Sequence, residues 1–285
     1  MPPQHPPSPS HRIATVQLSI RGRPVRMEMA VPTRLLRPED MLPLFRKIAE
    51  GLLALAIAEA ANAARHVSCK PACGACCRQL VPISPAEARH ISALIDRQPL
   101  PARTRLRQRF ADARLKLQHA GLLHSLLQPP PMTKEDRHEF GRRYFALHIP
   151  CPFLENESCS IHPDRPIPCR EYVVTSDPAH CASLDPHLIQ ALPPPAGPIW
   201  RAVAALDQPP AAQSVPWAPL ILAPDCAAHY PPPAPRPGTD IFADFLHHLA
   251  PASPPNPRGI LPLSPSPGTP GEGRGEGSES IPPGF

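Results

Sequence analysis

The chain is poor in the residues that build a large hydrophobic core. Only 5% of its 285 residues are aromatic, and 42% are hydrophobic by a broad count that includes alanine. No segment reaches the roughly 18 consecutive apolar residues of a membrane-spanning helix, so we expect no transmembrane segment. The N-terminus lacks the apolar core and the cleavage site of a secretory signal. These absences predict a cytoplasmic protein.

The net charge of the chain is also small. The chain has 29 basic and 24 acidic residues, a formal net charge of +5, and the cations are 25 arginines and four lysines. This excess is too small and too dispersed to require an acidic partner. The arginine-rich segment near 102–119 carries its cations largely away from its apolar stripe, which favours a solvated helix face over a nucleic-acid contact. The sequence has no phosphate-binding glycine loop and no dinucleotide fingerprint.

Proline, in contrast, is abundant. A compact domain cannot absorb 48 prolines, because each one fixes φ and removes a backbone donor. Of these, 29 fall within residues 1–10, 193–238 and 251–285. We therefore expect disorder over 1–10, a Pro-rich wrap with a terminal helix over 193–250, and a disordered low-complexity tail over 251–285. Such segments suit a protein partner that recognises polyproline.

The remaining chain predicts a mainly α fold of a small α+β kind. Apolar alternation over 12–31 predicts an N-terminal β-hairpin, and apolar residues at steps of three and four predict a long helix from Pro38 to about Arg65. These two elements make up a unit over 11–65. Further helix starts are expected at Ser84, where Glu87 completes a capping box, near Ala102, at Thr133, near Asp185 and at Asp240. The C-terminal third is expected to be irregular.

Nine cysteines carry the strongest functional signal. Four lie within nine residues, and a second group follows in a segment rich in Pro, Asp and Ser: Cys69, Cys73, Cys76 and Cys77, then Cys151, Cys159, Cys169 and Cys181. In a reducing compartment these are better explained as metal ligands than as disulfides. Sulfur ligands suit zinc, Fe–S clusters or copper(I). Both groups fall in loops between expected helices, so within a domain over 66–192 they can converge on one metal site.

The number and spacing of the cysteines are compatible with more than one kind of metal site. Eight thiols are enough for two four-sulfur sites, or for one cluster and a structural zinc. The adjacent Cys76 and Cys77 are awkward for one tetrahedral ion, so one sulfur faces a second metal or is not a ligand. Cys181 stays open between a ligand and a buried side chain. Cys226, alone in the Pro-rich stretch, is expected to be a small buried hydrophobe.

Three polar residues lie next to the second group of cysteines. Arg165 and Arg170 would offset the negative charge of thiolates and lower their pKa, the alternative being solvent-exposed arginines. His162 is a candidate nitrogen ligand, but a lone loop histidine is more often a bystander. We place these three residues around the metal site, not among its sulfur ligands.

The complete double motif resembles a known family. Cys-x3-Cys-Gly-x-Cys-Cys-Arg from Cys69, followed about 75 residues later by Cys-Pro-Phe-Leu, Cys-x-Ile-His-Pro-x-Arg-Pro and Cys-Arg, resembles the YkgJ-type (CxxCxxCC) cysteine-cluster family of zinc- or iron-chelating domains. The likeness covers roughly 66–181. It implies that the cluster consists of Cys69, Cys73, Cys76, Cys77, Cys151, Cys159 and Cys169, with Arg165-Pro166 and Arg170 as basic companions. The position of His162 is often tyrosine in such proteins.

This resemblance implies two roles. One is a metal-binding protein that holds zinc or iron, including an Fe–S cluster. The other is an Fe–S-dependent enzyme, because the family includes flagellin lysine methylase-like members. The spacing of Cys69, Cys73 and Cys76 also matches radical SAM enzymes, but no alternating strands and helices follow, which disfavours that fold. A third reading is a purely structural metal site, with partners recruited by the Pro-rich segments.

Overall fold

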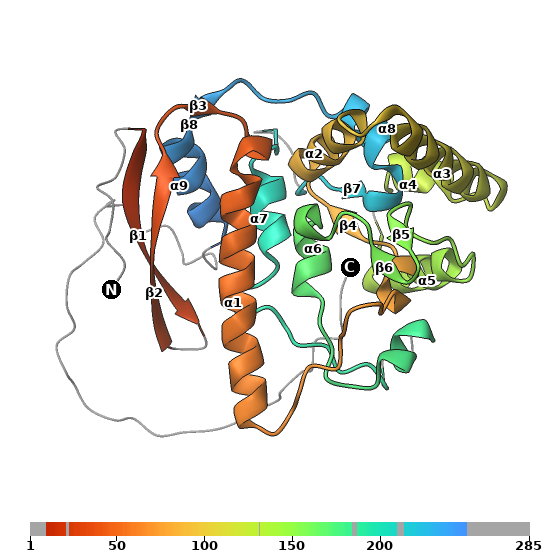
Figure 1. The fold of residues 1–285 in the computed structure, drawn as a ribbon, viewed down its shortest axis with the longest axis horizontal. Coiled ribbons are helices and arrows are strands. Elements are labelled where there is room, and N and C mark those ends of the chain that lie inside the picture. Colours follow the sequence, from red (N-terminus) through yellow and green to blue (C-terminus); the bar gives the residue numbers. More distant parts are fainter. Residues whose placement is uncertain (1–9, 21–22, 131, 184–186, 210–213, 250–285) are drawn as a thin grey trace.

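The computed structural model describes residues 10–20, 23–130, 132–183, 187–209 and 214–249 (Figure 1). The segment expected to be disordered at 1–10 lies outside these residues except for Ser10, and the expected tail at 251–285 lies wholly outside them. Among the described residues no helix is both long and apolar enough to cross a bilayer. The fold is mainly α, as the sequence predicts, with an N-terminal hairpin and short antiparallel strand pairs.

The expected elements form close to their predicted positions. The hairpin consists of β1 (His11–Ile20) and β2 (Arg23–Pro32), and the long helix is a 3₁₀ turn, η1 (Pro38–Met41), followed by α1 (Leu42–Asn62). The other expected helices are α2 (Pro85–Asp96), α3 (Leu100–His119), α5 (Lys134–Phe145) and α9 (Gly238–Leu249). Capping boxes at Ser84 and Thr133 fix the starts of α2 and α5.

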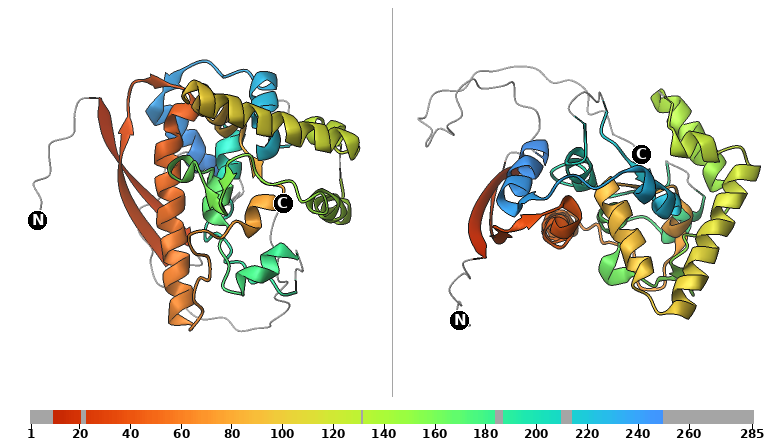
Figure 2. Two further views of the ribbon diagram at one scale, coloured as in Figure 1. Left: turned by 45° about the vertical axis from the view of Figure 1, so that its right-hand side comes forward. Right: turned by 90° about the horizontal axis from the view of Figure 1, so that it is seen from above.

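Segments from the N-terminal and C-terminal parts of the described chain build one hydrophobic core, which we call the terminal lobe. It consists of β1, β2, α1, α7 (Ile199–Ala205) and α9, and Figures 1 and 2 show these elements grouped on one side of the molecule. The Phe45 and Phe245 rings stack with centroids 4.4 Å apart at its centre. Short strands β3 (Leu35–Leu36) and β8 (Arg236–Pro237) pair beside it. Gly238 fits here because a Cβ would lie 2.4 Å from the Pro32 carbonyl oxygen.

A second hydrophobic core, the cysteine lobe, lies beside the first. It contains α2, α3, α4 (Leu123–Leu127), α5, the hairpin of β5 (Leu154–Glu155) and β6 (Ser158–Cys159), the 3₁₀ turn η5 (Leu220–Leu222), and α8 (Ala223–His229). Strands β4 (Pro82–Ile83) and β7 (Ala218–Pro219) pair and bring the Pro-rich segment into this lobe. The short helix α6 (Ile167–Glu171) lies between the lobes, with Ile167 in the terminal core and Cys169 against the cysteine-lobe core.

The C-terminal third is less irregular than expected. Helices α7 and α8 and the turn η5 form within 193–238, because their prolines occupy helix-start positions where a missing N–H costs little: Pro198, Pro219 and Pro224. These elements are too short to display a helical period. The expected helix near Asp185 is wrong over residues 187–192, where a β-bridge joins Ala191 to Val174; its first residues lie outside the described chain.

Candidate metal centre

The first cysteine group occupies the loop after α1 and a 3₁₀ turn, η2 (Ala75–Arg78). The Cys73 amide donates to the Lys70 carbonyl (3.2 Å), and Ala72 has the positive φ of 62° that such a turn usually assigns to glycine. The Val174 amide contacts the Cys69 sulfur at 3.5 Å. The loop is therefore attached to the chain that follows α6, 105 residues away in sequence.

The second group comes from four separate short elements. Cys151 precedes β5, Cys159 ends β6, Cys169 lies in α6, and Cys181 lies in the 3₁₀ turn η4 (Pro178–Ala182). Asn156 and Glu157, both with positive φ, form the two-residue turn of the β5–β6 hairpin. The short helix around Cys169 is a feature that the sequence pattern did not reveal.

The two cysteine-bearing loops lie against each other. The Cys151 amide donates to the Cys77 carbonyl (2.8 Å), and Arg78 forms an ion pair with Glu157 (2.7 Å). A Cβ on Gly74 would lie 2.5 Å from Glu157 Oε2 and 2.8 Å from Leu154 Cδ1. Gly74 therefore allows the first loop to approach the β5–β6 hairpin, and this packing needs no positive φ.

Cys76 is at the electrostatic centre of the thiols. Its charge acts on thiols from both loops and from η4: Cys69, Cys77, Cys151, Cys159, Cys169 and Cys181. Cys69 is exposed, Cys181 is buried, and the thiols of the two loops between them in sequence are half-buried. Cys226 is buried in the hydrophobic core of the cysteine lobe, as expected for a small buried hydrophobe.

The pKa values of the thiols differ in direction. A hydrogen bond with the Cys77 thiol lowers the pKa of Cys76, against the effect of burial, and Arg165 lowers it further. Burial raises the pKa of Cys151 to about 12 and that of Cys181 to about 11. Burial also raises the pKa of Cys69, Cys159 and Cys169, and Arg165 partly opposes this rise at each. Cys76 is the thiol that this environment favours as a thiolate.

The donors fit a thiophilic metal in kind and in number. Eight thiols are held in two touching loops and η4, and thiolate sulfur is a preferred ligand of zinc and of Fe–S clusters. Within the described ranges, no three His, Cys, Asp or Glu side chains are already grouped as a set that could hold an ion. The predicted ligand set therefore stays a prediction.

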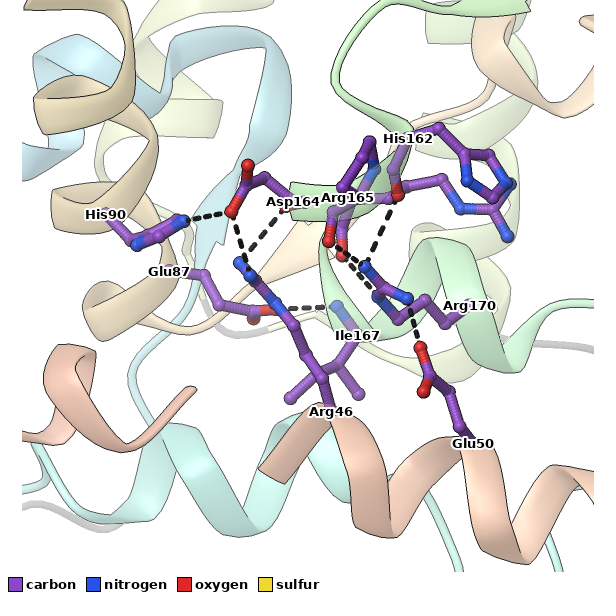
Figure 3. A network of polar contacts seen from close by, with 10 residues as sticks. Arg46, Glu50, Glu87, His90, His162, Asp164, Arg165, Ile167 and Arg170 are labelled. Carbon is purple, nitrogen blue, oxygen red and sulfur yellow. Dashed lines mark hydrogen bonds and ion pairs between the residues drawn. The ribbon is translucent and has the colours of Figure 1, made fainter. Parts of the chain in front are cut away.

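The three polar residues predicted around the site differ in their contacts (Figure 3). Arg170 ion-pairs with Glu50 of α1 and donates to the Arg165 carbonyl (2.7 Å) and the His162 carbonyl (3.3 Å). Arg165 acts electrostatically on four of the thiols, and its buried Nε has no hydrogen-bond partner among the described residues. His162 is exposed. Arg170 thus supports the loop backbone and acts on Cys159 alone among the thiols with a resolved shift, whereas Arg165 acts on four of them.

A buried polar network behind the second loop was missed from the sequence. The 3₁₀ turn η3 (His162–Asp164) ends at Asp164, which binds Arg46 of α1 and His90 of α2. Glu87, which the sequence identifies only as a capping residue, also accepts a hydrogen bond from the Ile167 amide at the start of α6 (2.7 Å). The sequence signal for this network was Arg46, which follows the apolar Phe45 in the expected long helix. Both side chains are buried, and a buried arginine requires a polar or charged partner.

Comparison with known proteins gives one finding. Residues 68–186 match the family model CxxCxxCC, described as "Putative zinc- or iron-chelating domain". This range contains both cysteine loops and Cys181, and it leaves out α1, α7, α8, α9 and Cys226. Neither the curated proteins nor the solved structures contain a match to the chain.

Proposed function

We propose that the cysteine lobe binds zinc or iron, including iron in an Fe–S cluster, through Cys69, Cys73, Cys76, Cys77, Cys151, Cys159 and Cys169. The observation that carries this proposal is the contact between the two cysteine loops, in which the Cys151 amide donates to the Cys77 carbonyl (2.8 Å) and the charge of Cys76 acts on thiols of both loops. The family match over the same segment supports zinc or iron as the metal. Thiolates would supply the ligands, and the metal would supply a positive centre that joins the two loops.

The surroundings of the thiols support binding that is linked to proton release. Metal ligands must be deprotonated, and burial raises the pKa of most of these cysteines, so binding would release protons. The lowered pKa of Cys76 makes it the favoured first ligand. Arg165 would offset part of the negative charge that several thiolates bring together. Zinc or iron would thereby stabilise the contact between the two loops.

Cys181 is proposed as an eighth ligand. It is buried with Val174 and Ile189, and its charge interacts with those of Cys69, Cys73 and Cys76. Gln79 donates to the Cys181 carbonyl (3.4 Å), which attaches η4 to the chain just after η2. These contacts support a role for Cys181 beside the first cysteine group, whereas Cys77 interacts with Cys151 and Cys169 of the second group.

Metal analysis of the full-length protein, purified without oxygen, tests the proposal. We expect zinc or iron in near-stoichiometric amount, with broad visible absorption if the metal is an Fe–S cluster and no colour if it is zinc. Cys76→Ser should lose most of the metal, because it removes the central thiol. Cys226→Ser is the matched control, since this thiol is buried in the core and its pKa is shifted by burial and Asp225 and not by another cysteine. Wild-type protein without either metal, or equal loss in both variants, would contradict the proposal.

A further inference from the structure

Side chains of α1 bind the segment between Cys159 and Cys169. Arg46 donates from Nη1 to Asp164 Oδ1 (3.2 Å) and from Nη2 to the Asp164 carbonyl (3.1 Å), so it binds both side chain and backbone (Figure 3). His90 Nε2 lies 3.1 Å from the same Oδ1. The side chain of Arg46 is only 8% exposed. This segment therefore cannot shift without breaking a partly buried, charge-assisted contact.

A second contact from α1 lies one turn further along the helix. Glu50 pairs with Arg170, whose guanidinium also donates to carbonyls of the 162–165 segment. Glu87 of α2 accepts from the Ile167 amide and fixes the start of α6. Together these contacts hold the backbone on both sides of Arg165 and just before Cys169. The residues on α1 lie outside the range that matches the family model.

These contacts fix the backbone of the segment that carries Arg165 and Cys169. With its backbone held by α1 and α2, the segment carries both Arg165, whose charge acts on four thiols, and Cys169, which is one of those thiols. We infer that Arg46 and Asp164 are positioning residues of the metal centre, acting through the 162–170 segment on Arg165 and Cys169. The inference rests on the proposed function. Groups that orient metal ligands without touching the metal typically change metal affinity 10–100-fold when removed.

A general role in folding is the competing explanation, and Arg89 separates the two. Its guanidinium is also 8% exposed, and it also bridges the lobes, with Glu39 of η1 and Asp207 after α7 each at 2.8 Å. It makes no described contact with the 162–170 segment or with a cysteine. Arg46 and Arg89 are therefore matched in burial and in charge, and they differ in what they hold.

The experiment measures the zinc dissociation constant of the reduced, metal-free, full-length protein by competition with a chromophoric chelator. We expect Arg46→Ala and Asp164→Ala each to raise this constant about tenfold or more, and Arg89→Ala to leave it unchanged. The effects of the two substitutions should be less than additive in the double variant, because each single variant already removes the Arg46–Asp164 side-chain contact. Asp164→Asn, which keeps the shape and an acceptor, should retain more affinity than Asp164→Ala. If the protein carries an Fe–S cluster, the rate of iron loss to a chelator is compared in the same variants.

Each result decides between the explanations. Equal weakening by Arg46→Ala and Arg89→Ala, or unchanged affinity in all variants, would overturn the inference while the proposed function stands. Additive effects in the double variant would also overturn it, because the two residues would then act separately. If the wild-type protein binds neither zinc nor iron, the proposed function fails and the inference falls with it. If Arg46→Ala fails to fold, the zinc affinity of Asp164→Asn relative to that of the wild type decides between a positioning role and a general role in folding.

Discussion

Gly74 shows how one residue allows two distant loops to meet. A Cβ at this position would lie 3.2 Å from Glu157 Cα and closer still to its carboxylate. The Cα belongs to a tight two-residue turn and cannot move as a flexible side chain can. The close approach that brings Cys73 and Cys76 toward the β5–β6 hairpin thus depends on the absence of a side chain at Gly74.

Gly74→Ala should therefore lower the free energy of unfolding, by about 1–3 kcal/mol for a crowded buried site. Gly51→Ala is the matched control, because a Cβ there meets nothing within 4 Å and alanine favours the interior of α1 by about 0.5–1 kcal/mol. Urea unfolding of the reduced, metal-free protein measures both changes. Equal stability of the two variants would show that the loops are not in close contact at Gly74.

Residues whose partners are near in sequence were predictable, and those with distant partners were not. The N-caps at Ser84 and Thr133 need only a side chain three residues on, so the sequence predicts both helix starts correctly, and at Ser84 it also predicts the capping box. Gly74 and Arg46 have their decisive partners 83 and 118 residues away, respectively. The sequence identifies the cysteines as a group because the chemistry of sulfur needs no knowledge of the fold.

At the scale of elements, two short helices take their N-terminal caps from elsewhere in the chain. Proline precedes both α6 and α7 and offers no capping side chain. Glu87 accepts from the Ile167 amide of α6, and Glu171 of α6 accepts from the Ile199 amide of α7 (2.8 Å). Helices of five to seven residues show no clear period, and caps from distant residues leave no local signal. This explains why the sequence did not predict α6 and α7.

Glu171 makes the stability of this arrangement depend on pH. Burial, with a contribution from Glu87, raises the pKa of Glu171 from 4.5 to about 8. Between these two values the folded protein holds one more proton than the unfolded chain, so the free energy of unfolding falls as the pH rises. The slope from this group is at most about 1.4 kcal/mol per pH unit.

Glu171→Gln keeps an acceptor for the Ile199 amide and removes this titration. We expect the variant to gain stability relative to the wild type as the pH is raised from about 5.5 to 7.5, a range within the titration window. Urea unfolding of the reduced, metal-free proteins at both pH values measures the difference. Glu28→Gln, on the solvent-exposed side of the hairpin, is the control and should show no such change. A constant difference between Glu171→Gln and wild type would exclude a raised pKa.

For the whole molecule, the important feature is that the cysteine lobe is not continuous in sequence. The matched range ends at residue 186, yet Ala218, Leu220, Ile221 and Leu222 lie in the same core as the helices that support the cysteines. Strand β7 pairs with β4 just before α2. The abundance of proline predicted an irregular wrap over 193–250, and sparse apolar residues between its prolines complete the core. Amino-acid composition gives the number of prolines in a segment, whereas packing depends on their positions in the sequence.

A fragment of residues 66–192 should therefore lack a cooperative unfolding transition, although it contains both cysteine loops. Within the full chain, Leu222→Ala tests the same point: Leu222 is 0% exposed, and its truncation should cost about 2–5 kcal/mol. Leu115→Ala, at a position 50% exposed on α3, should change stability by less than about 0.5 kcal/mol. Circular dichroism during urea unfolding measures all three.

A fragment that unfolds cooperatively at the midpoint of the full chain would mean that β7, η5 and α8 cover a core that is already complete. A non-cooperative fragment beside a weakened Leu222→Ala would show that metal binding has to be studied in the intact chain.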